Sequence, residues 1–384
     1  MNIVNLVLND FTHDNRVLKI SELLQSAGHQ VTVAAVHRNH LLEREKHAAG
    51  FEIHRIRTFT PSKLLGGAIK WAEFCLRIIW TFRSAEVWHC NDAEAFVIGL
   101  VAKTIRPRIR LVYDCHEFES ERNGKPAWYN RKVGWVERRF IRKAEAVLVV
   151  SPSIEKAYRE RYGRFGLKGI HLVRNVPNRA VRTSEPSNSP MRQQLGLKEN
   201  DFLALYQGKL TWNRGVEELL EMAPHLEEFE IHLAFMGYGE LAEKVMATAT
   251  KNTHVHFIPA VAYADILTYT ADADVGLVSV KPTCLSYLYC LPNKLFECIQ
   301  AGVPVLVNEL PDCEEILQRY SIGKSVSGLK PQDWLNALVE VKTSKINWKM
   351  EARSGFLQAQ EDLNWETESL TLVRIYREIF LKQL

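Results

Sequence analysis

The sequence predicts an α/β fold in which two Rossmann-like, doubly wound domains each contain a parallel sheet. Three observations carry this prediction. The chain of 384 residues is longer than one ordinary hydrophobic core organises, so two domains are the default expectation. Short apolar runs alternate with segments of helical periodicity, as parallel strands joined by crossover helices require. The alternation stops once, in the Pro-, Ser- and Asn-rich stretch 178–200, which indicates a linker.

The first domain is expected over residues 1–185. Between its first two strands, Val17, Ile20 and Leu24 repeat at helical spacing, and Gly28 ends the predicted helix. Its predicted strands cover residues 3–8, 31–36, 85–90, 109–115 and 144–151.

The second domain is expected over residues 186–364, and an amphipathic helix over 365–384 follows it. Ligands of open parallel sheets bind beyond the carboxyl ends of the strands. If the two sheets face each other across an interdomain cleft, both sets of strand ends line that cleft. The predicted strands cover residues 202–208, 231–237, 255–260, 275–280 and 303–308.

Basic residues are concentrated in the first half of the chain. The net charge is +4, but residues 1–190 contain 31 Lys and Arg against 19 Asp and Glu, and residues 191–384 contain 18 against 26. The halves therefore carry +12 and −8, which indicates an anionic partner for the first half. We disfavour nucleic acid, because no known module with interleaved stacking aromatics is present.

The composition favours a cytoplasmic protein. The first residues lack the basic segment and cleavage site of a signal peptide. No stretch reaches the ~20 apolar residues of a membrane span. The seven cysteines are odd in number and show no CxxC spacing, which fits reduced thiols and not a zinc site.

The most informative stretch is YQGKLTWNRGVEEL, residues 206–219. Gly208 ends an apolar run and Gly215 precedes an amphipathic pattern, so Lys209 and Arg214 flank a strand-to-helix loop. Backbone N–H groups and the helix dipole favour an anion at such a loop. An ordinary solvated loop is the alternative, since the stretch is neither a Walker A sequence nor a GxGxxG motif.

A second candidate is CLPNKLFECIQAGVPVLV, residues 290–307. A helix is expected to begin near Asn293, with Glu297 in its first turn. A carboxylate there complements the helix dipole, which is a structural reason for it, but it is equally suited to bind a ribose diol. Backbone amides around Asn293 and Lys294 would receive phosphate.

Polar residues also follow strands of the first domain. His116 and Asp92 each come directly after a predicted strand, and the polar loop before the first helix supplies Asp14 and Arg16. A lone histidine is more often packed or solvated, but its place at a strand end favours function. Asp92 is suited either to cap the next helix or to touch a ligand.

Two further patterns are weak signals. Gly237 and Gly239 form a GxG sequence after a strand, which usually marks only a tight turn. Asp272 and Asp274 spell DxD, but we read them as the end of a helix that enters a strand, not as metal ligands.

In this order, the segments resemble the retaining glycosyltransferases of family 4, group 1 type, which have the GT-B architecture. DNRVLKISELLQSAGHQVTV is similar to the family's first helix and second strand, and VWHCND and LVYDCHEF to its N-domain motifs. GKLTWNRGVEELL resembles its diphosphate loop and LPNKLFECIQAGVPVLV its donor-binding helix. The resemblance covers essentially the whole chain. It implies an acceptor-binding first domain, a donor-binding second domain and a last helix that crosses back to the first.

The resemblance also implies a role for each candidate residue. The expected catalytic residues are His116, Lys209, Arg214 and Glu297. The expected donor-binding residues are Gly208, Asn293, Lys294, Gly237 and Gly239. The expected acceptor-binding residues are Asp14, Asn15, Arg16 and Asp92.

The expected reaction is transfer of a hexosyl or N-acetylhexosaminyl group from a nucleotide sugar with retention of configuration. Cations and helix-end amides would stabilise the leaving diphosphate, so no metal or other cofactor is expected. No carboxylate stands out as a nucleophile, which favours front-face displacement. Tyr289 stands where the family often has the first Glu of a Glu-x7-Glu pattern. A catalytically weak sugar-nucleotide-binding or scaffold protein is therefore the alternative.

Two basic segments bear on the acceptor. Residues 62–83 combine Lys63, Lys70, Arg77 and Arg83 with many aromatic and aliphatic residues, as an interfacial helix does. Residues 122–143 add eight more Lys and Arg. A core-packing helix with solvated charges is the alternative. We expect peripheral attachment to an anionic membrane and a cell-surface glycan or lipid-linked acceptor.

Overall fold

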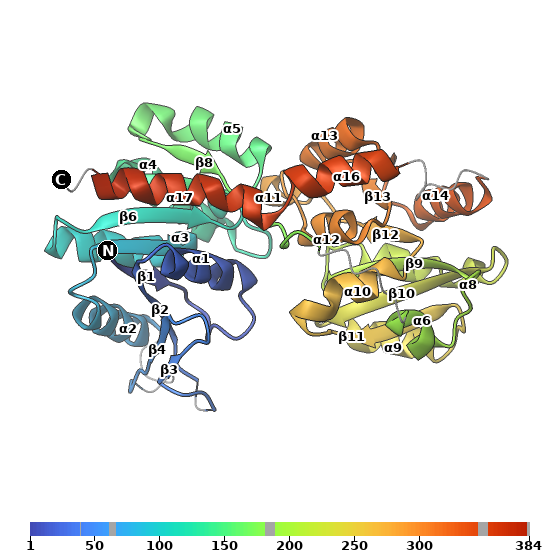
Figure 1. The fold of residues 1–384 in the computed structure, drawn as a ribbon, viewed down its shortest axis with the longest axis horizontal. Coiled ribbons are helices and arrows are strands. Elements are labelled where there is room, and N and C mark those ends of the chain that lie inside the picture. Colours follow the sequence, from blue (N-terminus) through green and yellow to red (C-terminus); the bar gives the residue numbers. More distant parts are fainter. Residues whose placement is uncertain (39, 61–66, 181–188, 345–351, 382–384) are drawn as a thin grey trace. The chain divides into compact units, whose positions relative to one another are not determined.

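The computed structural model describes residues 1–38, 40–60, 67–180, 189–344 and 352–381. The chain divides into two compact units. Unit 1 comprises Met1–Arg174 and Ser369–Leu384, and unit 2 comprises Asn175–Glu368. Each unit is an open sheet with helices packed on it (Figure 1), which is the predicted α/β class.

Unit 1 contains an eight-stranded sheet of order β3-β4-β2-β1-β5-β6-β7-β8. Neighbouring strands are parallel, except that β3 and β4 pair antiparallel at one edge. The strands are β1 (Asn2–Leu6), β2 (Gln30–Val36), β3 (Arg44–Lys46), β4 (Glu52–Ile56), β5 (Val87–Asn91), β6 (Arg110–Cys115), β7 (Ala144–Val149) and β8 (Ile170–Leu172).

The helices of unit 1 follow its strands. Helix α1 begins where Asp14 accepts a hydrogen bond from the backbone N–H of Val17 at 3.2 Å, a standard N-cap. The helices are α1 (Asn15–Ser26), α2 (Ala68–Thr81), α3 (Asp92–Ile105), α4 (Ala127–Phe140), α5 (Pro152–Tyr162) and, from Ser369 onward, α17 (Trp365–Leu381). A short 3-10 turn, η1 (Glu119–Glu121), follows β6.

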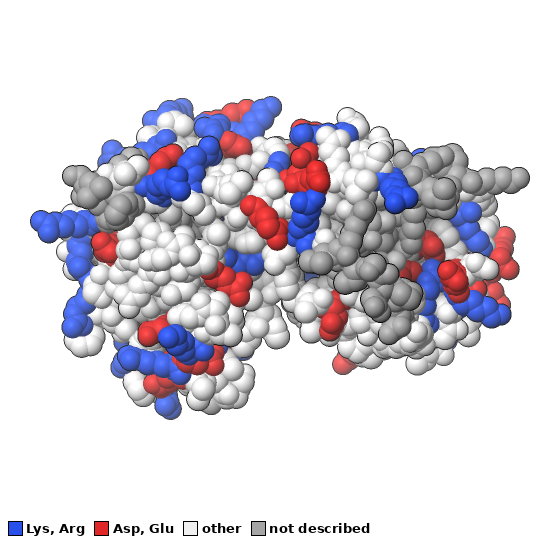
Figure 2. All heavy atoms as spheres, viewed as in Figure 1, with Lys and Arg blue, Asp and Glu red and all other residues white. Residues whose placement is uncertain are grey.

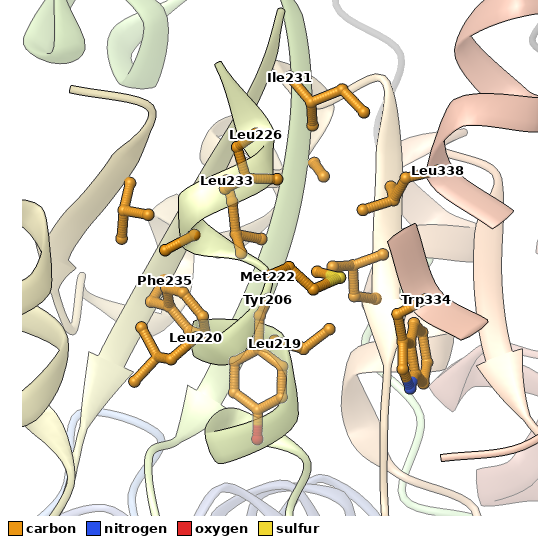
Figure 3. Close-up of a cluster of buried hydrophobic side chains, with 14 of the residues drawn as sticks. Tyr206, Leu219, Leu220, Met222, Leu226, Ile231, Leu233, Phe235, Trp334 and Leu338 are labelled. Carbon is orange, nitrogen blue, oxygen red and sulfur yellow. The ribbon is translucent and has the colours of Figure 1, made fainter. Parts of the chain in front are cut away.

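Unit 2 contains a six-stranded sheet that is parallel throughout, in the order β11-β10-β9-β12-β13-β14. Its core contains Tyr206, Phe235 and Trp334, which pack with leucines such as Leu219 and Leu338 (Figure 3). The strands are β9 (Phe202–Lys209), β10 (Ile231–Tyr238), β11 (Val255–Pro259), β12 (Val275–Val278), β13 (Val305–Asn308) and β14 (Gly323–Val326). The helices are α6 (Pro190–Leu195), α7 (Val216–Glu221), α8 (Ala223–Leu226), α9 (Ala242–Ala249), α10 (Ile266–Ala271), α11 (Leu285–Leu288), α12 (Asn293–Ala301), α13 (Pro311–Tyr320), α14 (Pro331–Thr343) and α16 (Arg353–Asp362).

The unit boundaries differ from those expected at residues 185 and 364. The chain enters unit 2 already at Asn175, because the backbone beyond it bonds within that unit. The Pro177 carbonyl accepts a hydrogen bond from the Trp365 N–H at 2.9 Å, and the Ala180 N–H donates to Gln300 Oε1 at 3.0 Å. The start of the last helix belongs to unit 2 for the same reason.

The prediction that residues 178–200 form a linker was wrong in part. Residues 181–188 lie outside the described residues, but Pro190–Leu195 forms α6. The Asp272 carboxylate holds this helix by accepting hydrogen bonds from the N–H groups of Met191 and Arg192, at 2.7 and 3.3 Å. Sequence patterns also missed the strands β3, β4, β8 and β14, which are short or carry polar residues.

The strand order places the switch point of each sheet. In unit 1, β1 lies between β2 and β5, and in unit 2, β9 lies between β10 and β12. At a switch point, the connections that follow two neighbouring strands run to opposite sides of the sheet. Ligands of such sheets bind in the crevice that this leaves at the carboxyl ends of the strands. The candidate ligand-binding residues therefore lie in the loop after β9 and directly after β5.

Candidate active site

The loop between β9 and α7 lies at the switch point of unit 2. Lys209 is the exposed last residue of β9, and Arg214 precedes the N-cap of α7. The Arg214 guanidinium lies 4.9 Å from the centre of the Tyr287 ring, and its Nε donates to the Tyr287 hydroxyl at 3.3 Å. Burial opposes the charge, but Tyr287 outweighs it and raises the pKa of Arg214. The cation is thus held in one orientation.

Two glycines shape this loop. Gly215 has φ +77°, and a Cβ there would lie 1.9 Å from Ser279 Oγ. Gly208 has φ +112°, and a Cβ there would have Lys294 Cε as its nearest neighbour, at 4.0 Å. A side chain at residue 208 would therefore project toward Lys294. Both φ values lie in the region that favours glycine.

Lys294 lies in the first turn of α12 and is only 6% exposed. Its Nζ lies 3.3 Å from the centre of the Tyr206 ring and, within the described part of the chain, has no hydrogen-bond partner. Burial, reinforced by the charge of Arg214, lowers the pKa of Lys294 well below its ordinary value. Two basic side chains and a helix N-terminus thus lie together, and an anion placed among them would favour the protonated form of Lys294.

Glu297 does not lie in the first turn of α12, as the sequence predicted; the first turn contains no acidic residue, and Glu297 lies one turn further. Its Oε2 accepts a hydrogen bond from Gln207 Nε2. Gln207 is 3% exposed, and its Oε1 accepts from the Thr270 hydroxyl at 2.8 Å. Sequence reasoning missed Gln207. Its signal was a polar residue in an apolar strand.

The other residues that were expected to bind the sugar donor, Asn293, Gly237 and Gly239, make close contacts within unit 2. Asn293 is exposed, and its Oδ1 accepts from Asn175 Nδ2 at 3.1 Å. Gly237 and Gly239 allow β10 to lie close to the strand and loop beside it. A Cβ at these residues would lie 1.9 Å from the Gly208 carbonyl oxygen and 2.2 Å from the Leu210 carbonyl oxygen. The structure thus explains both glycines by backbone packing that shapes the loop.

In unit 1, Arg16 is buried and bonded. Its Nε and Nη2 donate to the two Asp114 oxygens at 2.9 and 2.7 Å, and its Nη1 donates to the Val173 carbonyl at 2.9 Å. This corrects the expectation that Arg16 contacts an acceptor, since its donor groups are used inside the unit. Burial would raise the pKa of Asp114, but Arg16 and two histidines hold it well below its usual range. Asp114 is therefore ionised.

His89 and His116 both face this carboxylate. Burial lowers the pKa of His89, which keeps it neutral. Its Nε2 lies 3.2 Å from Asp114, and its Nδ1 lies 2.8 Å from the Tyr376 hydroxyl of α17. His116 differs. Burial opposes its charge, but Asp92 and Asp114 outweigh burial and raise the pKa of His116 to about 9. His116 is therefore an imidazolium at neutral pH.

Asp92 lies beside His116, with 3.7 Å between its Oδ1 and His116 Nδ1. This Oδ1 is buried and has no hydrogen-bond partner among the residues described. Asp92 adopts φ +66°, which is unusual for a residue other than glycine and indicates local strain. The N-cap of α3 is Asn91, not Asp92.

Glu119 supports this strained turn and was missed by sequence reasoning. It is fully buried, and its Oε2 accepts a hydrogen bond from the Ala93 N–H at 3.1 Å. Burial and the nearby Asp92 raise the pKa of Glu119 well above its ordinary value. No motif pointed to it, because its partner lies on another element.

Asp14 and Asn15 lie at the start of α1. Asp14 caps the helix and also accepts a hydrogen bond from Asn9 Nδ2 at 2.9 Å. Asn15 is the first residue of α1 and partly exposed.

The DxD sequence, Asp272 and Asp274, was interpreted as the end of a helix that enters a strand, and this interpretation is confirmed. Asp274 accepts from Arg192 and from the Leu203 N–H, at 2.7 and 2.8 Å.

Comparison with known proteins assigns the chain to a family. The model described as Glycosyltransferase Family 4 matches residues 14–176, and the model described as Glycosyl transferases group 1 matches residues 201–343. A glycogen synthase of Nitrosomonas europaea is 21% identical over 223 residues, which are 54% of this chain. The chain covers only 43% of the length of that enzyme.

Solved structures share the whole fold. A sucrose-phosphate synthase from Thermosynechococcus elongatus has a TM-score of 0.78 at 17% identity, over 100% of both chains. Anabaena HepE in complex with UDP and glucose has a TM-score of 0.76 at 17% identity, over 98% of this chain and 99% of that one. From both family models and this fold, the chain belongs to the group 1 glycosyltransferases of family 4, with the GT-B architecture.

Proposed function

We propose that the protein transfers a hexosyl or N-acetylhexosaminyl group from a nucleotide-sugar donor to an acceptor, with retention of anomeric configuration. The observation that carries the proposal is the convergence of Arg214 and the buried amine of Lys294, which has no hydrogen-bond partner among the described residues, on the N-terminus of α12, beside the β9 loop. This arrangement suits the diphosphate of a nucleotide sugar. Anabaena HepE, which shares the fold, is described in complex with UDP and glucose.

Lys209, Arg214 and Lys294 would stabilise the negative charge that develops on the leaving diphosphate. Glu297, oriented by Gln207, would accept hydrogen bonds from the donor ribose. With the diphosphate bound, these basic groups would supply the charge that a metal ion would otherwise provide, so we propose a metal-independent reaction. Turnover should then be unchanged by a chelator.

In unit 1, His116 carries a proton at neutral pH. It would donate a hydrogen bond to the donor sugar or its phosphate, and is not suited to act as a base. Asp92 Oδ1 lies beside the His116 ring but has no hydrogen-bond partner among the described residues, and it would accept a hydrogen bond from an acceptor hydroxyl. For the retaining step, we propose front-face displacement, in which the leaving phosphate takes the proton of the acceptor hydroxyl.

We also propose that unit 1 binds an anionic membrane surface at the cytoplasmic side and that the acceptor is a lipid-linked or cell-surface glycan. Helix α2 supports this, because one face packs inward through Phe74 and Ile78 while Leu76 and Trp80 are 66% and 71% exposed. Of the expected segment 62–83, residues 62–66 lie outside the described residues. In the described parts of the chain, no helix combines the length and hydrophobicity that a bilayer span needs.

Two substitutions test the enzyme assignment. We expect Lys209→Ala and Arg214→Ala each to lower kcat by 10²-fold or more, as loss of one preorganised charge donor does. Lys244→Ala, an exposed lysine on α9, is the matched control and should leave kcat unchanged. A thermal-shift panel of UDP-, GDP-, ADP-, CMP- and dTDP-sugars chooses the donor for the assay. Wild-type rates in both variants would refute the assigned roles.

The alternative is a sugar-nucleotide-binding or scaffold protein, and Tyr289 in place of the family's usual Glu favours it. Such a protein would raise its melting temperature with a nucleotide sugar but neither hydrolyse nor transfer it. Product formation measured on the purified protein decides between the two functions.

A further inference from the structure

A groove on unit 1 is lined almost wholly by apolar side chains. It lies between α2, α3 and α4 and has a volume of about 440 Å³, within the range of small-molecule sites. Its lining includes Trp71 of α2, Phe96 and Val97 of α3, and Trp128, Tyr129 and Val133 of α4.

The polar groups of the groove floor are satisfied elsewhere. Tyr113 forms part of the lining, but its hydroxyl donates to Glu137 Oε1 at 2.9 Å. The hydroxyls of Tyr158 and Tyr162 donate to the same buried carboxylate at 2.5 and 2.6 Å. Glu137 is thus held on the inner side, and the second lining carboxylate, Glu94, accepts hydrogen bonds from Tyr129 and Arg122. The groove floor therefore offers a ligand a mainly apolar surface.

Large apolar side chains stand open at the groove rim. Trp71 is 42% exposed and Trp128 is 60% exposed. The outward residues Leu76 and Trp80 continue the apolar surface along α2. A helix that is apolar on its inner and outer faces is expected to be covered on both.

Basic side chains surround the same surface. Lys70 and Arg77 lie on α2 and Lys132 lies on α4, all exposed. Lys and Arg side chains also gather over α5 (Figure 2). Lysines beside aromatic residues are the arrangement that meets a bilayer interface, with the cations at anionic headgroups and the rings among the chains.

We propose that this groove binds one acyl chain of an anionic membrane phospholipid, whose headgroup phosphate lies at Lys70 and Lys132. The proposal rests on the membrane attachment proposed above and deepens it. The helix does not merely lie on the surface. The protein extracts one chain of a lipid into a defined site, which fixes the orientation of unit 1 on the bilayer.

The test measures binding of monomeric, short-chain phosphatidylglycerol below its micelle concentration by calorimetry, without any sugar donor. Replacing dihexanoyl by dioctanoyl lipid adds two methylenes to the bound chain and should tighten binding roughly tenfold. Trp128→Ser should weaken dioctanoyl binding about tenfold, and Val97→Phe, which fills the groove, should abolish it. Circular dichroism melting checks that Val97→Phe is folded.

Trp135→Ser is the matched control, because Trp135 lies on the same helix and is also 60% exposed, but does not line this groove. It should leave the affinity unchanged. An equal loss in both tryptophan variants, or an affinity that does not depend on chain length, would overturn the proposal in favour of surface adsorption. Tenfold tighter binding of a polyprenyl phosphate would overturn it in favour of an acceptor lipid. Because no sugar donor is present in this binding experiment, a negative result would not contradict the transferase assignment, which the kcat measurements test separately.

Discussion

The side-chain nitrogen of Lys294 lies 3.3 Å from the centre of the Tyr206 ring. The aromatic face would partly compensate a positive charge there, but no described group accepts a hydrogen bond from this nitrogen. The lysine is therefore poised to change its protonation when an anion arrives. Much of the proposed donor chemistry depends on this one contact.

We expect the protein to take up a proton when it binds a nucleoside diphosphate. Burial and Arg214 lower the pKa of Lys294, and a bound phosphate would raise it again. Calorimetry at pH 8 in buffers of different ionisation enthalpy measures the uptake. The uptake should vanish in Lys294→Met and persist in Lys244→Met. Equal uptake in both variants would show that another group titrates.

His116 makes the stability of the fold pH-dependent. Its pKa in the folded protein is about 9, above the ordinary value, so its stabilising contribution is complete below about pH 6.5 and is lost as the pH rises to 9. The loss is on the order of 3 kcal/mol. Urea unfolding of wild type and His116→Asn at pH 6 and pH 9.5 measures it. The stability gap between the two proteins should shrink at pH 9.5, and a constant gap would contradict the prediction.

The buried pair of Arg16 and Asp114 should be critical for unit 1. Arg16→Met leaves the Asp114 carboxylate buried without its main partner, which should lower the free energy of unfolding by roughly 3–5 kcal/mol. Arg38→Met is the control. Arg38 pairs with Asp10 at 2.8 Å but is 63% exposed, so its loss should cost about 1 kcal/mol or less. Similar costs in both variants would disprove a structural role for Arg16.

Gly215→Ala separates steric conflict from backbone strain. Its Cβ would meet Ser279 Oγ, whereas Gly28, with a similar φ of +83°, has open space where a Cβ would lie. Gly28→Ala should cost about 1–2 kcal/mol through strain alone. Gly215→Ala should cost roughly 1–3 kcal/mol more and should also displace the Arg214 loop, which weakens nucleotide binding. Equal costs in chemical denaturation would show that the loop relaxes freely.

Glu119 is expected to act as a positioning residue for Asp92. Glu119→Ala frees the Ala93 N–H and should release the strained turn, whereas Glu119→Gln keeps an acceptor there. If the role is positional, Glu119→Gln should retain the wild-type pH dependence of kcat, and Glu119→Ala should shift it by altering the pair of Asp92 and His116. Identical pH profiles in both variants would limit Glu119 to a purely structural role.

The amino-acid sequence was sufficient to predict the fold class, the strands at both switch points and the β9 loop that carries Lys209 and Arg214. These features depend on local periodicity and on glycines at strand ends, which neighbouring residues encode. It placed Glu297 in the first turn of α12; the helix does begin at Asn293 as expected, but Glu297 is its fifth residue and therefore lies in the second turn.

Which polar groups contact one another depends on the three-dimensional packing of the chain. His89 and Tyr376 bond although they are 287 positions apart, and Arg16, expected at an acceptor, is instead committed to Asp114. The partner of Gln207, the buried state of Lys294 and the apolar groove between α2 and α4 likewise arise from packing of separate elements. Burial and charge proximity set these pKa values and contacts, and both depend on distances in space that no local pattern records.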